Sequence, residues 1–181
     1  YNACDYCDDV LAETADVTFG DAWLPQYVSD SQGCNVVVVR NRTIQHILDK
    51  HAEELVLHDS TPEEIYQSQA GGFRHRRQGL AYRLDVHKKR GEWTPTKRVQ
   101  PSLEGIGKRR QKIYAMRTVL KNESFVAFTE AKKANNFSVF IKHMQPVERK
   151  YSTIQTPLSR RLLRKIKRLL KGILRRHQSR C

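Results

Sequence analysis

The first forty residues alternate short apolar runs with polar turns. Residues 16–19 alternate in polarity and predict a short strand that ends at Gly20. The β-branched run at 35–40 is typical of a strand buried on both faces. Apolar residues at helical spacing then predict a helix over 42–54, for which Thr43 is a candidate cap. Strand followed by helix favours an α/β core.

The next segment carries stronger local signals. Residues 55–58 predict another short strand. Residues 61–64 read Thr-Pro-Glu-Glu, which is a complete capping box with proline at the first helical position, so a helix begins there. The paired glycines at 71–72 predict a break before a second helix that ends near Gly91.

Beyond this point the pattern becomes helical throughout. A proline-containing linker covers 94–101, and apolar residues then recur at helical spacing. Two helix faces are predicted, one by Ile113, Met116 and Leu120, the other by Phe137, Phe140, Ile141 and Met144. We therefore predict an α/β fold with a mixed sheet and flanking helices, followed by a mainly helical C-terminal half and a basic amphipathic helix. The predicted domains are residues 1–92, 93–156 and 157–181.

Charge changes this picture only at the end of the chain. The formal net charge is +14, but residues 158–181 hold ten Lys or Arg and no acid, which leaves +4 for the first 157 residues. The same segment carries leucines and isoleucines in one helical stripe, which is typical of a helix at an anionic membrane surface. An acidic partner protein is an open alternative. Nucleic acid is not favoured, because no aromatic residues are interleaved for stacking.

Cysteine supplies the candidate chemistry. Cys4 and Cys7 have the C-x-x-C spacing that lets two thiolates bind one metal or cluster, although zinc and iron–sulfur sites usually take four ligands. Spacing alone leaves zinc, an iron–sulfur cluster and a redox dithiol open. Cys34 is interpreted as a small buried hydrophobe and Cys181 as a residue without a role.

Three motifs occur in a family-like order. They are C-D-Y-C-D-D at 4–9, A-D-V-T-F-G-D-A-W-L-P at 15–25, and G-C-N-V-V-V-V-R at 33–40. Together they resemble the C-terminal domain of the beta subunit of coenzyme F-420 hydrogenases and dehydrogenases, especially the branch found among bacterial polysaccharide-biosynthesis proteins. The resemblance covers roughly residues 1–90.

That resemblance implies a flavoprotein that passes electrons between a 4Fe–4S cluster, FAD or another flavin, and a small organic substrate or redox partner. Cys4 and Cys7 would then be cluster ligands. The flavin contacts that it implies are Asp16, Gly20, Asp21 and Arg40. The alternative interpretation of the Asp and Gly positions is a strand end with its turn, because turns use these residues routinely.

The resemblance also bears on completeness and location. Because the chain begins at Tyr1 directly before the cysteine motif, we interpret it as part of a longer protein whose N-terminal segment supplies further cysteines. No run approaches eighteen apolar residues, so we predict no transmembrane helix. The expected location is cytoplasmic, with residues 158–181 at the inner face of the cell membrane.

Three hypotheses follow. The first is a flavin- and iron–sulfur-dependent oxidoreductase in surface polysaccharide biosynthesis. The second is a non-catalytic zinc-binding assembly factor docked at the membrane surface, and the third is an adaptor that binds RNA through the tail. The basic cluster at 74–77 suits a phosphate clamp or, more ordinarily, a solvated helix face. No Walker motif, no G-x-G-x-x-G and no hydrolase constellation is present.

Overall fold

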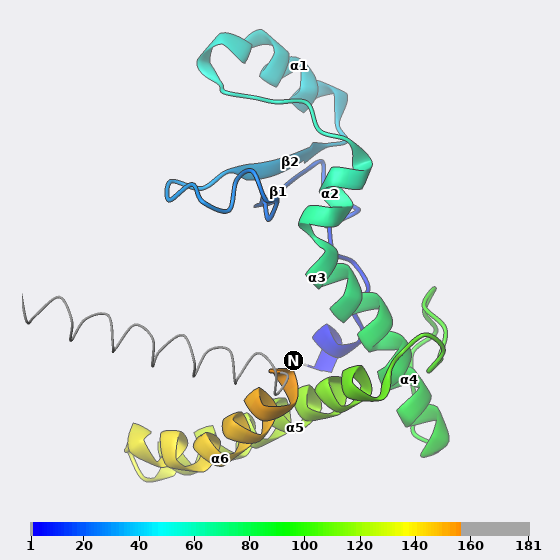
Figure 1. Cartoon of the computed structure of the whole chain (residues 1–181), viewed down its shortest axis with the longest axis vertical. Coiled ribbons are helices and arrows are strands. Elements are labelled where there is room, and N and C mark those ends of the chain that lie inside the picture. The colour runs from blue at the N-terminus through cyan, green and yellow to red at the C-terminus, as the bar shows by residue number, and fades with distance from the viewer. Residues whose placement is uncertain (1, 157–181) are drawn as a thin grey trace, which may run out of the picture. The chain divides into compact units, whose positions relative to one another are not determined.

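The computed structural model describes residues 2–156 (Figure 1). The chain divides into two compact units with the boundary after Glu104. The first unit holds the strands and several short helices, and the second holds two long helices. The predicted α/β class with a mainly helical C-terminal half is therefore confirmed. The predicted amphipathic helix at 157–181 lies outside the described residues.

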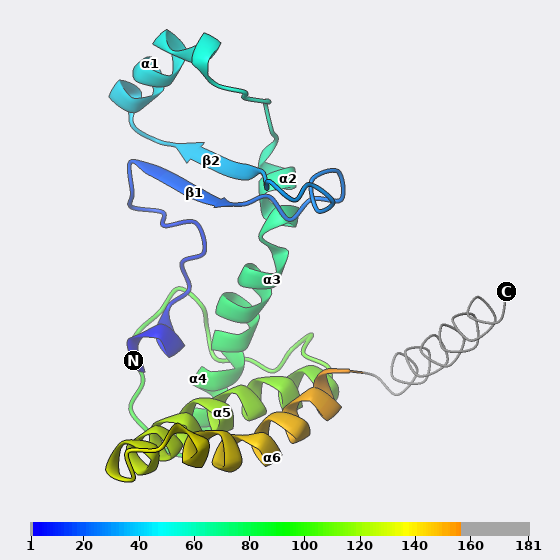
Figure 2. The same ribbon diagram turned by 90° about the vertical axis from the view of Figure 1, so that its left-hand side faces the viewer.

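Two strands form the sheet of the first unit. Strand β1 (Val17–Asp21) pairs antiparallel with β2 (Asn35–Val39), so that Val17 lies opposite Val39 and Asp21 lies opposite Asn35 (Figure 2). The connection between them turns at Gly33, whose φ of +82° is accessible to glycine at little cost. The predicted strands are thus both present.

The burial of β2 differs from the prediction. Val36 is buried, whereas the other three valines are only half-buried. In the described part of the chain, β2 has one neighbouring strand, and a cavity lies against its valines. A continuous valine run therefore does not guarantee burial on both faces.

Helix α1 (Arg42–Lys50) is shorter than predicted and has a different cap. The side-chain oxygen of Asn41 accepts hydrogen bonds from the backbone N–H groups of Thr43 at 2.8 Å and Ile44 at 3.4 Å, so Asn41 rather than Thr43 is the N-cap. A short 3₁₀ helix, η2 (Ala52–Glu54), follows. The strand predicted at 55–58 is absent, and the Val56 side chain is 90% exposed.

Helix α2 (Pro62–Ser68) begins as predicted. Thr61 Oγ accepts from the Glu64 N–H at 3.2 Å, and the Glu64 carboxylate accepts from the Thr61 N–H at 2.9 Å. This pair is the reciprocal capping box. The Thr61 backbone N–H, together with the Ser60 hydroxyl, lowers the pKa of Glu64.

The predicted break at Gly71-Gly72 is wrong. Helix α3 (Ala70–Phe73) runs through both glycines into a π-helical segment, η3 (Arg74–Gln78), and then into α4 (Gly79–Lys89). A Cβ on Gly72 would lie 3.0 Å from a methyl carbon of Val10, so glycine there permits a close approach of the N-terminal segment. The helix ends as predicted before Gly91, whose φ is +66°.

The second unit is a helical hairpin. Helices α5 (Lys108–Lys133) and α6 (Phe137–Gln155) lie side by side and are joined by residues 134–136 (Figures 1 and 2). Asn136 caps α6 by accepting from the Ser138 N–H at 2.9 Å. The buried residues on the two helices are Ile113, Tyr114, Met116, Ala127, Ala131 and Met144. Phe137 and Ile141, predicted to face a core, are exposed instead.

An ion-pair cluster spans the hairpin and makes it sensitive to pH. His143 lies between two carboxylates of α5, with Nε2 at 2.9 Å from Glu123 and Nδ1 at 2.9 Å from Glu130. Both ring nitrogens can donate only when the imidazole is protonated. The hydrogen bonds to Glu123 and then to Glu130 raise the pKa of His143.

Because the folded-state pKa of His143 is raised, its stabilising contribution is complete below the unfolded pKa of about 6.5 and is lost as pH rises through the folded value. We expect the thermal midpoint of the hairpin to fall over that interval. His143→Gln should remove this part of the pH dependence, measured as the difference between the variant and wild-type unfolding curves. Parallel curves across the whole range would contradict the prediction.

Candidate functional site

The two N-terminal cysteines lie on one tight turn. The 3₁₀ helix η1 (Asn2–Tyr6) leads into a hydrogen bond from the Cys7 N–H to the Cys4 carbonyl, 3.4 Å long. Side chains three residues apart eclipse one another in a 3₁₀ turn, so both thiols emerge on the same side. Cys4 is exposed and Cys7 is half-buried, and both are free thiols. The turn can therefore offer two sulfur ligands to one metal centre.

Ion pairs fix the chain directly after this turn. Asp8 is buried and contacts Lys97 Nζ at 3.1 Å and Arg98 Nε at 2.7 Å. Arg98 also donates two hydrogen bonds, of 2.7 and 2.8 Å, to the two carboxylate oxygens of Glu13. Bidentate pairs of this kind define position as well as adding energy.

The charges in this network stabilise one another. Burial raises the pKa of Asp8, but the hydrogen bonds from Lys97 and Arg98 lower it by more, so the net pKa is below the ordinary value. The hydrogen bond from Arg98 likewise lowers the pKa of Glu13. In return, Glu13 and then Asp8 raise the pKa of Arg98. All three groups are thus charged at neutral pH.

Helix α4 supports the turn from another direction. The buried Arg83 donates from Nε to the Asp5 carbonyl at 2.9 Å. The Tyr6 ring lies 6.1 Å from the His87 ring, measured between centroids. The turn therefore rests on residues some eighty positions further along the chain, within the same unit.

Within residues 2–156, no group of three or more His, Cys, Asp and Glu side chains is arranged to hold a metal ion. Two thiols on one turn are half of the usual four-ligand set. Their chemistry fits both a zinc ion and an iron–sulfur cluster, as the spacing predicted.

The four predicted flavin contacts lie at two ends of the β1–β2 pair. At one end, the Asp16 carbonyl accepts from the Arg40 N–H at 2.8 Å. The Arg40 guanidinium also donates to the carbonyls of Ala15 and Leu11, which holds the loop before β1. These contacts give Arg40 a structural task in addition to the predicted one.

At the other end, Gly20 lies opposite Val36 in the ladder. The Asp21 carbonyl accepts from Gln69 Nε2 at 2.7 Å and from Ser68 Oγ at 3.2 Å. A Cβ on Gly20 would lie 3.6 Å from Gln69, which is an ordinary contact. The structure brings Asp16 and Arg40 together and leaves Gly20 and Asp21 at the far end.

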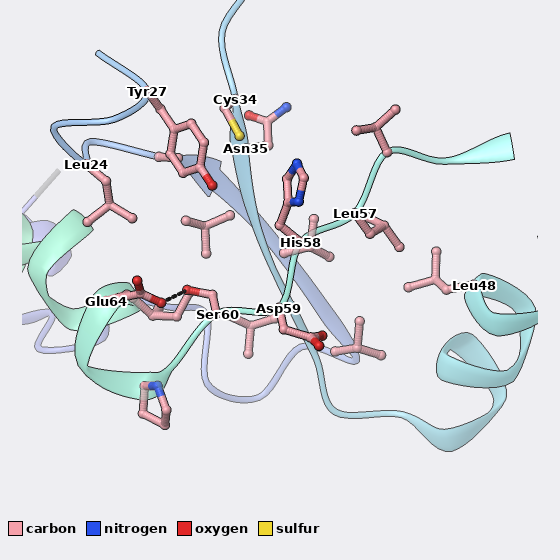
Figure 3. Close-up of a pocket in the computed structure, with 18 of the residues that line it drawn as sticks. Leu24, Tyr27, Cys34, Asn35, Leu48, Leu57, His58, Asp59, Ser60 and Glu64 are labelled. Atoms are coloured by element: carbon pink, nitrogen blue, oxygen red, sulfur yellow. Dashed lines mark hydrogen bonds between the residues drawn. The ribbon is translucent and has the colours of Figure 1, made fainter. Parts of the chain in front are cut away.

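A cavity of about 580 Å³ lies against β2 (Figure 3). Its walls are largely apolar and its rim carries a few polar groups, and none of the four predicted flavin contacts is among its lining residues. The lining residues labelled in Figure 3 are Leu24, Tyr27, Cys34, Asn35, Leu48, Leu57, His58, Asp59, Ser60 and Glu64. Such a cavity suits a flat, mostly apolar group with polar edges.

Several of these residues escaped the sequence interpretation. Asp8 stood within the quoted motif without a role, and its partners Lys97 and Arg98 lie beyond the predicted first domain. His58 was assigned to a strand that does not form, although it faces the cavity beside Cys34 (Figure 3). Adjacent acids directly after C-x-x-C, without a local basic partner, are the signal that could have suggested distant cations.

The basic cluster at 74–77 forms part of the π-helical segment η3. Arg77 lies 4.7 Å over the Phe73 ring and 3.6 Å from Glu13. This arginine therefore packs against its own unit, as cations over aromatic faces do.

Helices capable of crossing a membrane were sought among the described residues, and none is both long and apolar enough.

Comparison with known proteins identifies a family. Residues 1–64 match the family that is described as the C terminus of the coenzyme F420 hydrogenase/dehydrogenase beta chain. No curated protein and no solved structure matches the chain. The matched segment contains the cysteine turn, both strands and the capping box of α2, whereas Arg83, Lys97 and Arg98 lie beyond it. Through its first 64 residues, the chain belongs to the coenzyme F420 hydrogenase/dehydrogenase beta subunit family, of which these residues form the C-terminal part.

Proposed function

We propose that this chain is the C-terminal part of a flavin- and iron–sulfur-dependent oxidoreductase that acts in bacterial surface polysaccharide biosynthesis. Membership of a hydrogenase and dehydrogenase family indicates a redox role. One observation carries the proposal further: two free thiols lie on the same side of a single turn, inside the matched segment.

The cysteine turn suits a cluster as half of its ligand set. Cys4 and Cys7 would bind a 4Fe–4S cluster, and cysteines of an N-terminal segment of the same protein would complete it. When bound, the cluster supplies one-electron transfer. The residues of this chain place it: Asp8 and Arg83 fix the turn from both sides, so the two sulfurs keep their separation.

The cavity against β2 would accommodate the ring of FAD or another flavin. When bound, the flavin supplies the exchange of an electron pair with an organic substrate. The valines of β2 and Leu24 would exclude water from the ring. His58 and Ser60 are rim groups able to hydrogen-bond its polar edge or hold a proton there. This location shares β2 with the predicted contacts but replaces their side chains with those that line the cavity.

The proposed setting is the cytoplasmic face of the cell membrane. The basic, leucine-striped segment 158–181 would be attracted to anionic lipid by about 1 kcal/mol per basic residue near the surface. Lipid-linked glycans are assembled at this face, and the substrate would be a small organic molecule or a redox partner of that process.

Cofactor analysis of the complete protein, purified without oxygen, tests this function. We expect iron and acid-labile sulfide in equal amounts, together with bound flavin released on denaturation. A colourless protein that holds zinc would instead support a structural metal site in an assembly factor. A protein with neither metal nor flavin would contradict the proposal altogether.

A further inference from the structure

The positive charge of the chain is concentrated outside the first unit. Residues 1–104 carry 12 Lys or Arg against 16 Asp or Glu, a net charge of −4. Residues 105–156, which include α5 and α6, carry 11 Lys or Arg against three Glu, a net charge of +8. A helical hairpin with this excess attracts an anionic partner and disfavours association with a second copy of itself.

The same hairpin exposes aromatic side chains near its turn. Phe125, Phe128 and Phe137 are 55%, 58% and 64% exposed, and Ile141 is also exposed. The Phe137 ring stacks on the Phe140 ring at a centroid distance of 5.2 Å. Among the described residues of this unit, five of the six large exposed apolar side chains lie in this half of the hairpin.

Helical periodicity gathers these residues on one face. On α5, Phe125 and Phe128 are three positions apart, and Lys121 and Lys132 are four positions before and after them respectively, so all four lie along one stripe. On α6, Phe137 and Ile141 are four apart and share a stripe. The ion pairs of His143 lie on the other side of the contact line between the helices. One broad face is therefore aromatic with a lysine fringe, and the opposite face is polar.

We propose that this aromatic face of the α5–α6 hairpin inserts into the interface of an anionic lipid bilayer. Phenylalanines backed by lysines are the composition with which helices lie in a membrane interface, where rings enter the acyl boundary and ammonium groups reach the headgroups. Net charge supports this occupant over the basic segment 158–181, which the hairpin would repel. The inference concerns residues distinct from that segment and does not depend on the redox function.

A tryptophan at position 128 tests the insertion directly. In the full chain with Trp23→Phe and Trp93→Phe, both exposed positions, Phe128→Trp provides a single reporter. With vesicles of phosphatidylcholine and phosphatidylserine we expect a blue shift of its emission and quenching by brominated lipid. Pure phosphatidylcholine should give a much smaller response. Unchanged emission while the chain still sediments with anionic vesicles would overturn the proposal, because another segment would then be the anchor.

Partition measurements supply the second arm. In the full chain we expect Phe125→Ser with Phe128→Ser to reduce vesicle partitioning about tenfold. Val56→Ser, which removes an exposed apolar side chain of the first unit, should leave it unchanged. Unaltered circular dichroism would show that the double variant is folded. If Lys132→Gln weakens binding while the phenylalanine pair does not matter, the surface is purely electrostatic, as for nucleic acid, and the insertion is refuted.

Discussion

Replacing either Cys4 or Cys7 by serine is expected to abolish iron and sulfide binding in the complete protein. A serine oxygen is a poor substitute for a thiolate at an iron–sulfur centre, and each cysteine supplies one of the two ligands on the turn. The fold should survive, because the Cys4 side chain is exposed and the turn is held by its neighbours. Iron and sulfide assays on protein purified without oxygen measure the effect.

Cys34→Ser is the matched control for this experiment. Cys34 is also a free, half-buried thiol of the same unit, but it lines the cavity at β2 rather than the turn. Iron content should therefore equal that of the wild-type protein. If Cys34→Ser loses as much iron as Cys7→Ser, the loss reflects general damage and the ligand assignment fails.

The second large effect is expected at Asp8. Asp8→Asn removes a buried carboxylate that pairs with Lys97 and Arg98, and it leaves these two cations without this partner. We expect the free energy of unfolding to fall by roughly 1–2 kcal/mol, since hydrogen bonds between charged groups contribute about 1.5–3 kcal/mol and both cations keep some contact with water. Chemical denaturation at neutral pH measures the change.

The acid dependence gives a sharper criterion for the same variant. Because the folded-state pKa of Asp8 is lowered, its contribution is present above the unfolded value of about 3.9 and is lost as pH falls through the folded value. The stabilities of wild-type protein and Asp8→Asn should therefore converge in acid. Asp30→Asn, at an exposed carboxylate that accepts a hydrogen bond within its own turn, should behave as the wild type. A difference that persists unchanged at low pH would rule out the ion pairs as its cause.

The parts of the fold that sequence predicted well are those that depend on neighbours in the chain. The capping box at Thr61 and Glu64 is local chemistry, and it forms as predicted. The stop near Gly91 is equally local, since it needs only a residue that tolerates positive φ. The two strands were predicted from composition, and their pairing follows from a connection that holds no crossover helix.

The errors arise where a distant contact decides the outcome. Gly72 continues a helix because its missing side chain admits Val10, more than sixty residues earlier, and no local rule reports that contact. Residues 55–58 have strand-like composition but no partner strand in the described part of the chain, and β-propensity without a partner is a weak signal. The paired phenylalanines of α6 were interpreted as a core face, yet Phe137 is exposed.

The candidate site shows the same division. Cys4 and Cys7 could be chosen from spacing, whereas Lys97, Arg98 and Arg83 act on the turn from beyond residue 64, where the family match ends. Support of the motif by the following helix and loop is thus a property of the folded unit. The family match reaches the proposed ligands, and the structure adds the residues that hold them in place.

An electron paramagnetic resonance spectrum of the complete protein, reduced without oxygen and recorded at low temperature, tests the central claim most directly. If Cys4 and Cys7 bind a 4Fe–4S cluster, the reduced wild-type protein will give the signal of a paramagnetic cluster, and Cys7→Ser will not. Bound zinc with no such signal, or the same signal in both proteins, would contradict the assignment of the turn as an iron–sulfur ligand pair.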